Sequence, residues 1–257
     1  MPEGPSLVYI KNEIAHFAGR KVTAAGGYTQ METGWLVGKK LLEVKTWGKH
    51  LLLRFNNGTV RIHLMLFGSL LVNKTKKVNA SFYVHFGKDQ LNFYVAKAQK
   101  IDGPLEKTYD WRTDILSPEW NQAPVLKLLD DNGDATIGDL LMDQQVFTGV
   151  GNIIRIEVLF RAKLHPLCLV KNIPLKDRKV LLKEVRKYAK EFLREKNAGT
   201  FGSNWQVYQQ EECPRDGAVI KVAMLGKTKR KTYYCSNCQV LHSPRKKGSK
   251  HTIPAKD

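Results

Sequence analysis

The spacing of apolar residues changes several times along the chain, and the first segment has the period of a helix. Its apolar positions recur every three or four residues, as one face of a helix requires. The positions are Leu7, Ile10, Ile14 and Phe17. Pro5 can open this helix, because the first turn needs no donor from the missing N–H of proline. We therefore expect a helix from Pro5 to near Gly19.

Short apolar runs bounded by turn residues come next, and they have the length and pattern of β-strands. The sequence Asn56-Asn57-Gly58 between two of these runs is a strong hairpin signal. The predicted strands cover residues 50–55, 59–64, 68–72, 80–86 and 91–96. This pattern predicts one helix combined with a β-sandwich or barrel.

Helical spacing returns near Pro118, and it predicts helices over residues 125–129, 137–145, 152–162 and 176–195. The last of these has an apolar face and a basic face, and we interpret the basic face as solvent-exposed. After Asn204 the pattern predicts short strands around cysteines. We expect an α+β multidomain protein with a β-domain, a helical domain, a β-hairpin and a flexible basic tail, at residues 1–117, 118–204, 205–243 and 244–257.

The charge of the chain favours a polyanionic partner. Lysine and arginine number 42 against 24 acidic residues, which gives a formal net charge of +18. Nucleic acid is the first candidate partner and an anionic membrane the second, and a soluble basic protein is the plainest alternative. No run reaches the roughly 18 apolar residues that span a bilayer, and the start lacks the pattern of a secretory signal. We expect an intracellular protein, in the cytoplasm and nucleoid of a bacterium or the nucleus of a eukaryote.

The first residues have a chemistry of their own. A small residue after Met1 permits its removal, and Pro2 would then carry a free secondary amine. An α-amino group has a pKa of about 8 against about 10.4 for lysine, so more of it is unprotonated and nucleophilic at neutral pH. Glu3 beside it is a candidate general acid and base. The alternative is an ordinary unstructured terminus.

Two further short motifs offer contacts for a nucleic acid. Lys49 follows Trp47-Gly48 at a predicted strand start, where it is either a solvated residue or a contact for a phosphate or a reacting nucleotide. Gly149-Val150-Gly151-Asn152 opens a predicted helix, whose free N–H groups and positive dipole end attract anions. With the amide of Asn152 this motif suits one phosphate. The alternative is a glycine-rich turn in which Asn152 is the N-cap.

Three of the four cysteines cluster in the C-terminal part of the chain, which suggests a metal site before a disulfide. The candidate ligands form two pairs, Cys213 with Asp216 and Cys235 with Cys238. Two such pairs on neighbouring hairpins make a tetrahedral zinc site, and a carboxylate can be one of its ligands. We expect one structural Zn²⁺ per chain. The alternatives are a hairpin that folds without metal and a redox Cys-x-x-Cys, although the latter lacks a surrounding βαβ pattern.

Taken in order, these motifs resemble the formamidopyrimidine-DNA glycosylase/endonuclease VIII family. The resemblance runs from residue 1 to about residue 242, and four motifs carry it: Met-Pro-Glu-Gly-Pro at the start, Gly48-Lys49, residues 149–152 with Glu157, and the paired metal-ligand motifs. It implies an N-terminal helix plus β-sandwich domain, a helix-two-turn-helix domain and a terminal zinc finger. DNA would lie in the cleft between the domains.

The resemblance also implies roles for individual residues, carried over position by position. Pro2 would be the Schiff-base nucleophile, Glu3 the proton donor, and Lys49 the hairpin lysine near the damaged nucleotide. The implied phosphate contacts are His63, Asn152 and Arg230. Between the metal-ligand pairs, the basic residues 226–231 predict a hairpin tip that grips phosphates, with a solvated loop as the alternative.

The sequence is more similar to the endonuclease VIII branch, because its start and residues 151–157 resemble that branch. The segment after His63 falls where the family carries residues that fill the gap left by an extruded base. Apolar wedges of this kind offset the cost of unstacking. The candidate wedge residues are Met65, Leu66 and Phe67, and the alternative is that they are core residues of a strand.

The implied function is that of a bifunctional DNA glycosylase and AP lyase of base excision repair. It would excise oxidised bases, pyrimidines above all, through a Pro2 Schiff base and β,δ-elimination, without a redox cofactor or catalytic metal. The expected partner is damaged double-stranded DNA, bound by a monomer that does not bind membranes. The alternatives are a formamidopyrimidine-type enzyme for oxidised purines and a non-catalytic nucleic-acid-binding protein, which a retained Met1 would produce.

Overall fold

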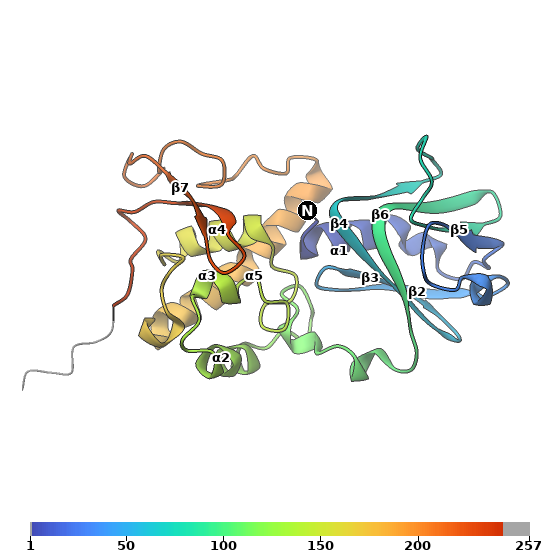
Figure 1. Cartoon of the computed structure of the whole chain (residues 1–257), viewed down its shortest axis with the longest axis horizontal. Helices are drawn as coiled ribbons and strands as arrows, with labels where there is room; N and C mark the ends of the chain where they lie inside the picture. The colour runs from blue at the N-terminus through green and yellow to red at the C-terminus, as the bar shows by residue number, and fades with distance from the viewer. Residues whose placement is uncertain (1, 244–257) are drawn as a thin grey trace, which may run out of the picture.

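The computed structural model describes residues 2–243, which form two main parts. One part is a sheet covered by a helix, and the other is a group of helices with a small hairpin (Figure 1). The tail predicted at 244–257 lies outside the described residues. Among the helices of the described part, none combines the length and apolarity that crossing a membrane requires.

The predicted first helix is confirmed. It is α1 (Gly4–Ile14), which a 3₁₀ turn extends to Phe17. Pro5 lies in the first turn of α1, and the buried residues Leu7 and Ile14 of this helix pack in the core of the sheet. The same helix contacts α5 (Leu175–Ala198) of the second part, so the chain begins between the two parts (Figure 1).

The strands of the first part form one antiparallel sheet in the order β1-β5-β6-β4-β3-β2. They are β1 (Ala24–Gly26), β2 (Leu41–Trp47), β3 (His50–Phe55), β4 (Gly58–Val72), β5 (Phe82–Phe86) and β6 (Asp89–Ile101). The two runs predicted at 59–64 and 68–72 are therefore parts of one strand.

The two ends of this sheet enclose one core. Leu51 and Leu53 of β3 belong to the same buried cluster as Phe82 and Val84 of β5. One continuous sheet thus takes the place of the two separate sheets that a β-sandwich implies. The physical reason is the length of β4 and β6, which run through both halves and keep them hydrogen-bonded.

A bulge interrupts the pairing of β4 with β6. Between Leu64 and Ser69, β4 contains four residues that oppose a single residue of β6, Val95. The backbone φ of Val95 is 49°, which β-branched residues rarely adopt. The bulged residues are 46%, 52% and 79% exposed, in the order Met65, Leu66 and Phe67. The interpretation of these three as core residues is therefore wrong.

The second part contains α2 (Gln122–Asp131), α3 (Ile137–Leu140), α4 (Asn152–Arg161) and α5. The predicted helices at 125–129, 152–162 and 176–195 are confirmed within a few residues at their ends, whereas the helix predicted at 137–145 is too long. Side chains turn the chain after Leu140, because the Asp143 carboxylate accepts from the N–H of Gln145 at 2.8 Å and the Gln144 amide donates to the carbonyl of Val150 at 3.0 Å. Such local bonds compete with a continued helix.

The last described segment is a two-stranded hairpin, β7 (Lys221–Leu225) and β8 (Arg230–Tyr234). It packs on α4 through a small core of its own, which includes Ile156, Phe160 and Tyr233. The helices have a separate, larger core that contains the predicted apolar face of α5: Leu181, Val185, Tyr188 and Phe192.

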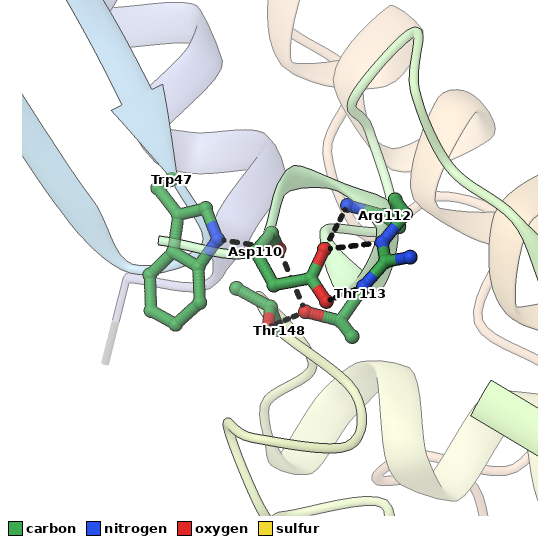
Figure 2. Close-up of polar contacts among 5 residues, drawn as sticks. All are labelled: Trp47, Asp110, Arg112, Thr113 and Thr148. Carbon is green, nitrogen blue, oxygen red and sulfur yellow. Dashed lines mark hydrogen bonds and ion pairs between the residues drawn. The ribbon is translucent and has the colours of Figure 1, made fainter. Parts of the chain in front are cut away.

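The two parts are fastened where β2 turns into β3. The indole N–H of Trp47 donates to the carbonyl of Asp110 at 3.0 Å, and the Thr113 hydroxyl donates to the same oxygen (Figure 2). Thr113 also bonds the hydroxyl of Thr148 at 2.9 Å. The N–H of Gly48 donates to the buried carboxylate of Asp114 at 2.8 Å. These bonds fix the β2–β3 turn against the helical part.

Two histidines lie on the face of the sheet that points away from its core. His50 of β3 pairs with His63 of β4, and the centroids of their rings are 5.6 Å apart. Burial lowers the pKa of His50 to about 4, and the charge of Arg61 acts in the same direction. His50 is therefore neutral at pH 7 in the folded protein.

We predict that His50 makes the protein less stable in acid. The unfolded chain binds a proton at this residue at a pH of about 6.5, and the folded protein only at a pH of about 4. Stability is therefore lost as the pH falls through this window, by up to roughly 1.4 kcal/mol per pH unit. Urea unfolding at pH 7 and pH 4.5 should show a smaller acid loss for His50→Gln than for the wild type. His16→Gln, at an exposed histidine, is the control and should behave as the wild type. An undiminished acid loss in His50→Gln would contradict the prediction.

Candidate active site and nucleic-acid interface

The side chain of Glu3 occupies the start of α4. Its carboxylate accepts hydrogen bonds from the N–H groups of Gly151, Ile153 and Ile154 at 3.1, 2.8 and 3.1 Å. A helix start leaves such donors without partners and carries a partial positive charge, so it suits an anion. Glu3 is only 2% exposed. The beginning of the chain is thus bound to the helical part across the junction.

The glycines of residues 149–151 make room for this contact. A Cβ on Gly151 would lie 2.3 Å from the carboxyl carbon of Glu3, so no larger residue fits there. The N–H of Gly4 donates to the carbonyl of Gly149 at 2.8 Å. Gly151 is the N-cap residue of α4, and the interpretation of Asn152 as the N-cap is wrong, because the carboxylate of Glu3 takes the capping role.

Pro2 and Lys49 differ in their exposure to solvent, and the charges of Lys49 and Glu3 influence each other. Pro2 is partly exposed at the junction, whereas Lys49 in the β2–β3 turn is buried. Burial raises the pKa of Glu3, against the opposing charge of Lys49 and the three backbone donors. Burial also lowers the pKa of Lys49, and the charge of Glu3 opposes this shift while that of Arg230 adds to it. The site therefore combines a carboxyl that retains its proton more readily than usual with an amine that loses it more readily.

Asn152 connects α4 with the hairpin. Its amide donates to the carbonyl of Lys231 at 3.0 Å and its oxygen accepts from Arg155 at 2.8 Å. Arg155 also donates to the Thr232 hydroxyl at 2.6 Å. Arg155 is 1% exposed, and burial lowers its pKa to about 10. Sequence reasoning did not identify this arginine as a structural link, although its apolar neighbours Ile154 and Ile156 were a signal of burial.

Two further acidic residues, for which no such role was predicted, hold the hairpin region by accepting hydrogen bonds from its backbone. Asp139 of α3 accepts from the N–H of Lys227 at the hairpin tip, at 2.9 Å. The buried carboxylate of Glu157 accepts from three successive N–H groups, those of residues 206–208, at 2.9 to 3.1 Å. Arg230, at the start of β8, is exposed on the hairpin thus fixed. Its charge lowers the pKa of both Lys49 and Arg155, so it lies near the junction.

His63 and the bulge bring the sheet to the same region. His63 is half-buried and pairs across strands with Lys97. Burial lowers the pKa of His63, and the charges of Lys49, Arg61 and Lys97 act in the same direction. Among residues 2–243, none of these three cations forms an ion pair with an acidic side chain. Lys49, Arg61 and Lys97 thus surround His63, which lies two residues before the exposed apolar residues 65–67.

The four predicted metal ligands lie together in the hairpin region. One ligand atom from each of Cys213, Asp216, Cys235 and Cys238 lies within 4.8 Å of all the others. The sulfur atoms of Cys213 and Cys238 are 3.8 Å apart, and the nearer carboxylate oxygen of Asp216 is 3.5 Å from the sulfur of Cys235. Zinc–sulfur bonds of about 2.3 Å in a tetrahedron separate sulfur atoms by about 3.8 Å, so this donor set fits such an ion.

Comparison with protein families gives two matches in chain order. The model described as the formamidopyrimidine-DNA glycosylase N-terminal domain matches residues 1–100. The model described as the formamidopyrimidine-DNA glycosylase H2TH domain matches residues 113–202. The two matches correspond to the sheet part and the helical part.

The similar curated proteins carry endonuclease VIII names. Human "Endonuclease 8-like 3" is 32% identical over 208 residues, which are 76% of this chain and 34% of that protein. Human "Endonuclease 8-like 2" is 33% identical over 196 residues, which are 70% of this chain and 57% of that protein. The chain thus spans between a third and three fifths of the length of these relatives.

Solved structures share the fold. A viral DNA glycosylase superposes with a TM-score of 0.81 at 21% identity, over 93% of this chain and 100% of the other. The formamidopyrimidine-DNA glycosylase of Lactococcus lactis, bound to DNA with an AP site, superposes with a TM-score of 0.82 at 19% identity, over 92% and 99% of the two chains. With both family models matched in order, the chain belongs to the formamidopyrimidine-DNA glycosylase/endonuclease VIII family, in its endonuclease VIII-like branch.

Proposed function

We propose that this protein is a bifunctional DNA glycosylase and AP lyase of base excision repair, and that it excises oxidised pyrimidines. The observation that carries the proposal is the contact of Glu3 with the start of α4. Because Pro2 directly precedes Glu3, this contact supports a place for Pro2 at the junction, where the charges of Glu3 and Lys49 influence each other. The names of the curated relatives belong to the endonuclease VIII branch, for which the sequence resemblance implies oxidised pyrimidines.

The first step forms a covalent bond between Pro2 and the sugar. Removal of Met1 frees the secondary amine, and α-amino groups, with a reference pKa of about 8, have a usable unprotonated fraction at neutral pH. The Pro2 nitrogen attacks C1′, the bond from C1′ to the damaged base breaks, and the base leaves with a proton. Glu3 is suited to moving this proton, because burial raises its pKa. The C1′–O4′ bond then breaks as the Pro2 nitrogen donates its electron pair, O4′ takes up a proton to become a hydroxyl, and the opened sugar is bound to Pro2 as an iminium ion.

Strand cleavage follows from that iminium ion. It acidifies the proton on C2′, and loss of this proton expels the 3′ phosphate in β-elimination. A second elimination expels the 5′ phosphate, and water releases the sugar fragment from Pro2. Lys49, whose pKa burial lowers and whose charge interacts with that of Glu3, is suited to share in proton movement or to contact a phosphate.

Damaged double-stranded DNA is the proposed partner, bound along the junction by a monomer. Asn152, Arg230 and His63 hold its phosphates, and the positively charged cluster of Lys49, Arg61 and Lys97 adds attraction. Met65, Leu66 and Phe67 fill the gap that the extruded nucleotide leaves, since they are exposed on the bulge.

The cysteine-containing hairpin acts as a structural zinc finger in this proposal. Cys213, Asp216, Cys235 and Cys238 would hold one Zn²⁺, which would stabilise the base of β7 and β8. The domains are proposed at residues 1–117, 118–204 and 205–243, in keeping with separate buried clusters for the sheet, the helices and the hairpin region.

Borohydride trapping tests the proposed function. Protein shown by mass spectrometry to begin with Pro2 should become covalently attached to duplexes with 5-hydroxyuracil or dihydrouracil, and less to 8-oxoguanine. Glu3→Gln should lower base excision by about 10² or more, because the amide cannot transfer a proton. Predominant trapping on 8-oxoguanine would contradict the pyrimidine preference. No trapping on any of the three would leave a non-catalytic nucleic-acid-binding protein.

Arg230→Ala should weaken duplex binding to all sequences alike. Loss of one phosphate contact lowers the slope of log K against log salt by about 0.9. Anisotropy titrations at several salt concentrations measure this slope. Lys127→Ala, at an exposed position on α2, is the control and should leave the slope unchanged. An unaltered slope in Arg230→Ala would argue against the phosphate contact.

Purified protein should contain about one zinc per chain by elemental analysis, as the donor set predicts. Asp216→Ala should lose this zinc and bind duplex more weakly, because the hairpin that carries Arg230 loosens. Asp216→Cys should retain both properties, since thiolate is also a zinc ligand. Full duplex affinity in a preparation without zinc would refute the structural role.

A further inference from the structure

A second pocket lies on the first part of the molecule, outside the site described above. It has a volume of about 420 Å³ and lies between Tyr28, the loop of residues 73–81 and the outer face of β5 and β6. Successive residues of a strand face opposite sides. Because Phe82 and Val84 are buried in the core, Tyr83 and His85 face the pocket. The volume falls within the range of ligand sites.

Aromatic rings form much of this pocket. The rings of Tyr83 and His85 are 4.7 Å apart at their centroids and tilted by 31°. Tyr94 lines the pocket as well, and the ammonium of Lys76 lies 4.8 Å from the centroid of its ring. Tyr28 at the rim is 89% exposed, which is unusual for a tyrosine. Exposed aromatic rings of this kind stack with nucleobases of any sequence.

Polar and charged side chains at the edges of the pocket are available to contact a ligand. The side-chain amides of Asn79 and Gln90 line it, and neither makes a hydrogen bond within residues 2–243. An amide offers a donor and an acceptor, which match the edge of a base. The loop also carries Lys74, Lys76 and Lys77, and in the described chain these lysines form no ion pair. The rim can therefore attract phosphates.

The walls of the pocket are held in place by hydrogen bonds. The N–H of Tyr28 donates to the carbonyl of Ala80 at 2.9 Å, and the N–H of Lys76 donates to the hydroxyl of Tyr94 at 2.9 Å. The ammonium of Lys76 also donates to the hydroxyl of Ser69 at 2.9 Å. Ser69 directly follows the bulge of residues 65–68, so the lysine-rich loop adjoins the exposed apolar segment.

We propose that this pocket binds an unpaired nucleobase of a single DNA strand. The base would stack on the rings of Tyr28 and Tyr83, and the flanking phosphates would lie on the lysines of residues 74–77. The contact of Lys76 with Ser69 places the rim beside the bulge, where a strand separated from its complement would emerge. This binding is independent of the chemistry of Pro2.

The test is binding of labelled oligothymidine to the full chain, with the junction filled by excess unlabelled duplex that carries tetrahydrofuran, an abasic-site analogue that cannot form the Schiff base. The wild type should still bind the single strand. Tyr28→Ala should weaken this binding by roughly tenfold, because one base–aromatic stack is lost. Tyr28→Phe is the matched variant and should bind as the wild type, since it retains the ring. Lys77→Ala should lower the salt slope by about 0.7, the value for one phosphate of a single strand.

Two results would overturn the proposal. One is equal affinity of the wild type and Tyr28→Ala for oligothymidine under these conditions, and the other is complete displacement of the oligothymidine by the duplex. Photocrosslinking of an oligonucleotide that contains 5-iododeoxyuridine should attach to a peptide with Tyr28 or Tyr83. Trapping on damaged duplex by the same Tyr28→Ala preparation separates the two proposals, because the loss of stacking should leave it unchanged.

Discussion

The carboxylate of Glu3 at the start of α4 is the contact on which the arrangement of the two parts depends. Three N–H groups at a helix start have no partners within the helix, and burying them without an acceptor would be costly. Glu3 satisfies all three from a position about 150 residues away in the chain. Because Pro2 is its neighbour, the same contact determines where the first residues lie. The fold and the candidate chemistry therefore share one set of hydrogen bonds.

A buried arginine and a partly buried aspartate fasten the hairpin to the helices in a similar way. Arg155 links Asn152 to Thr232, and Asp139 binds the backbone of the hairpin tip. Arg155 has lost much of its hydration, and hydrogen bonds of its Nη2 to Asn152 and Thr232 compensate for part of this loss. The exposed Arg230, whose proposed contact with DNA would weaken with salt, is thus carried on a hairpin that hydrogen bonds hold against the helices.

Elements with a long or regular apolar pattern could be predicted from the sequence. Features that depend on contacts between residues far apart in the chain could not. The faces of α1 and α5 and the strand β3 follow from local periodicity, and the four ligand residues of the hairpin follow from spacing. The short α3 was overestimated, because the side chains of Asp143 and Gln144 end it. The capping role of Glu3 was not predictable, since no local pattern indicates which distant carboxylate enters a helix start. Arg155 resembles any solvated arginine until its packing on the hairpin is known.

In β4, the residues whose hydrogen bonds and packing hold the sheet together are distinct from the residues of the bulge, which can vary. Hydrogen bonding stops at Leu64 and resumes at Ser69, so the side chains between them contribute little to the buried core. The single opposing residue, Val95, absorbs the mismatch in its unusual backbone conformation. Substitutions of the bulge residues should therefore change the stability of the folded protein little. In evolutionary terms, the residues of this bulge can drift while the scaffold stays the same.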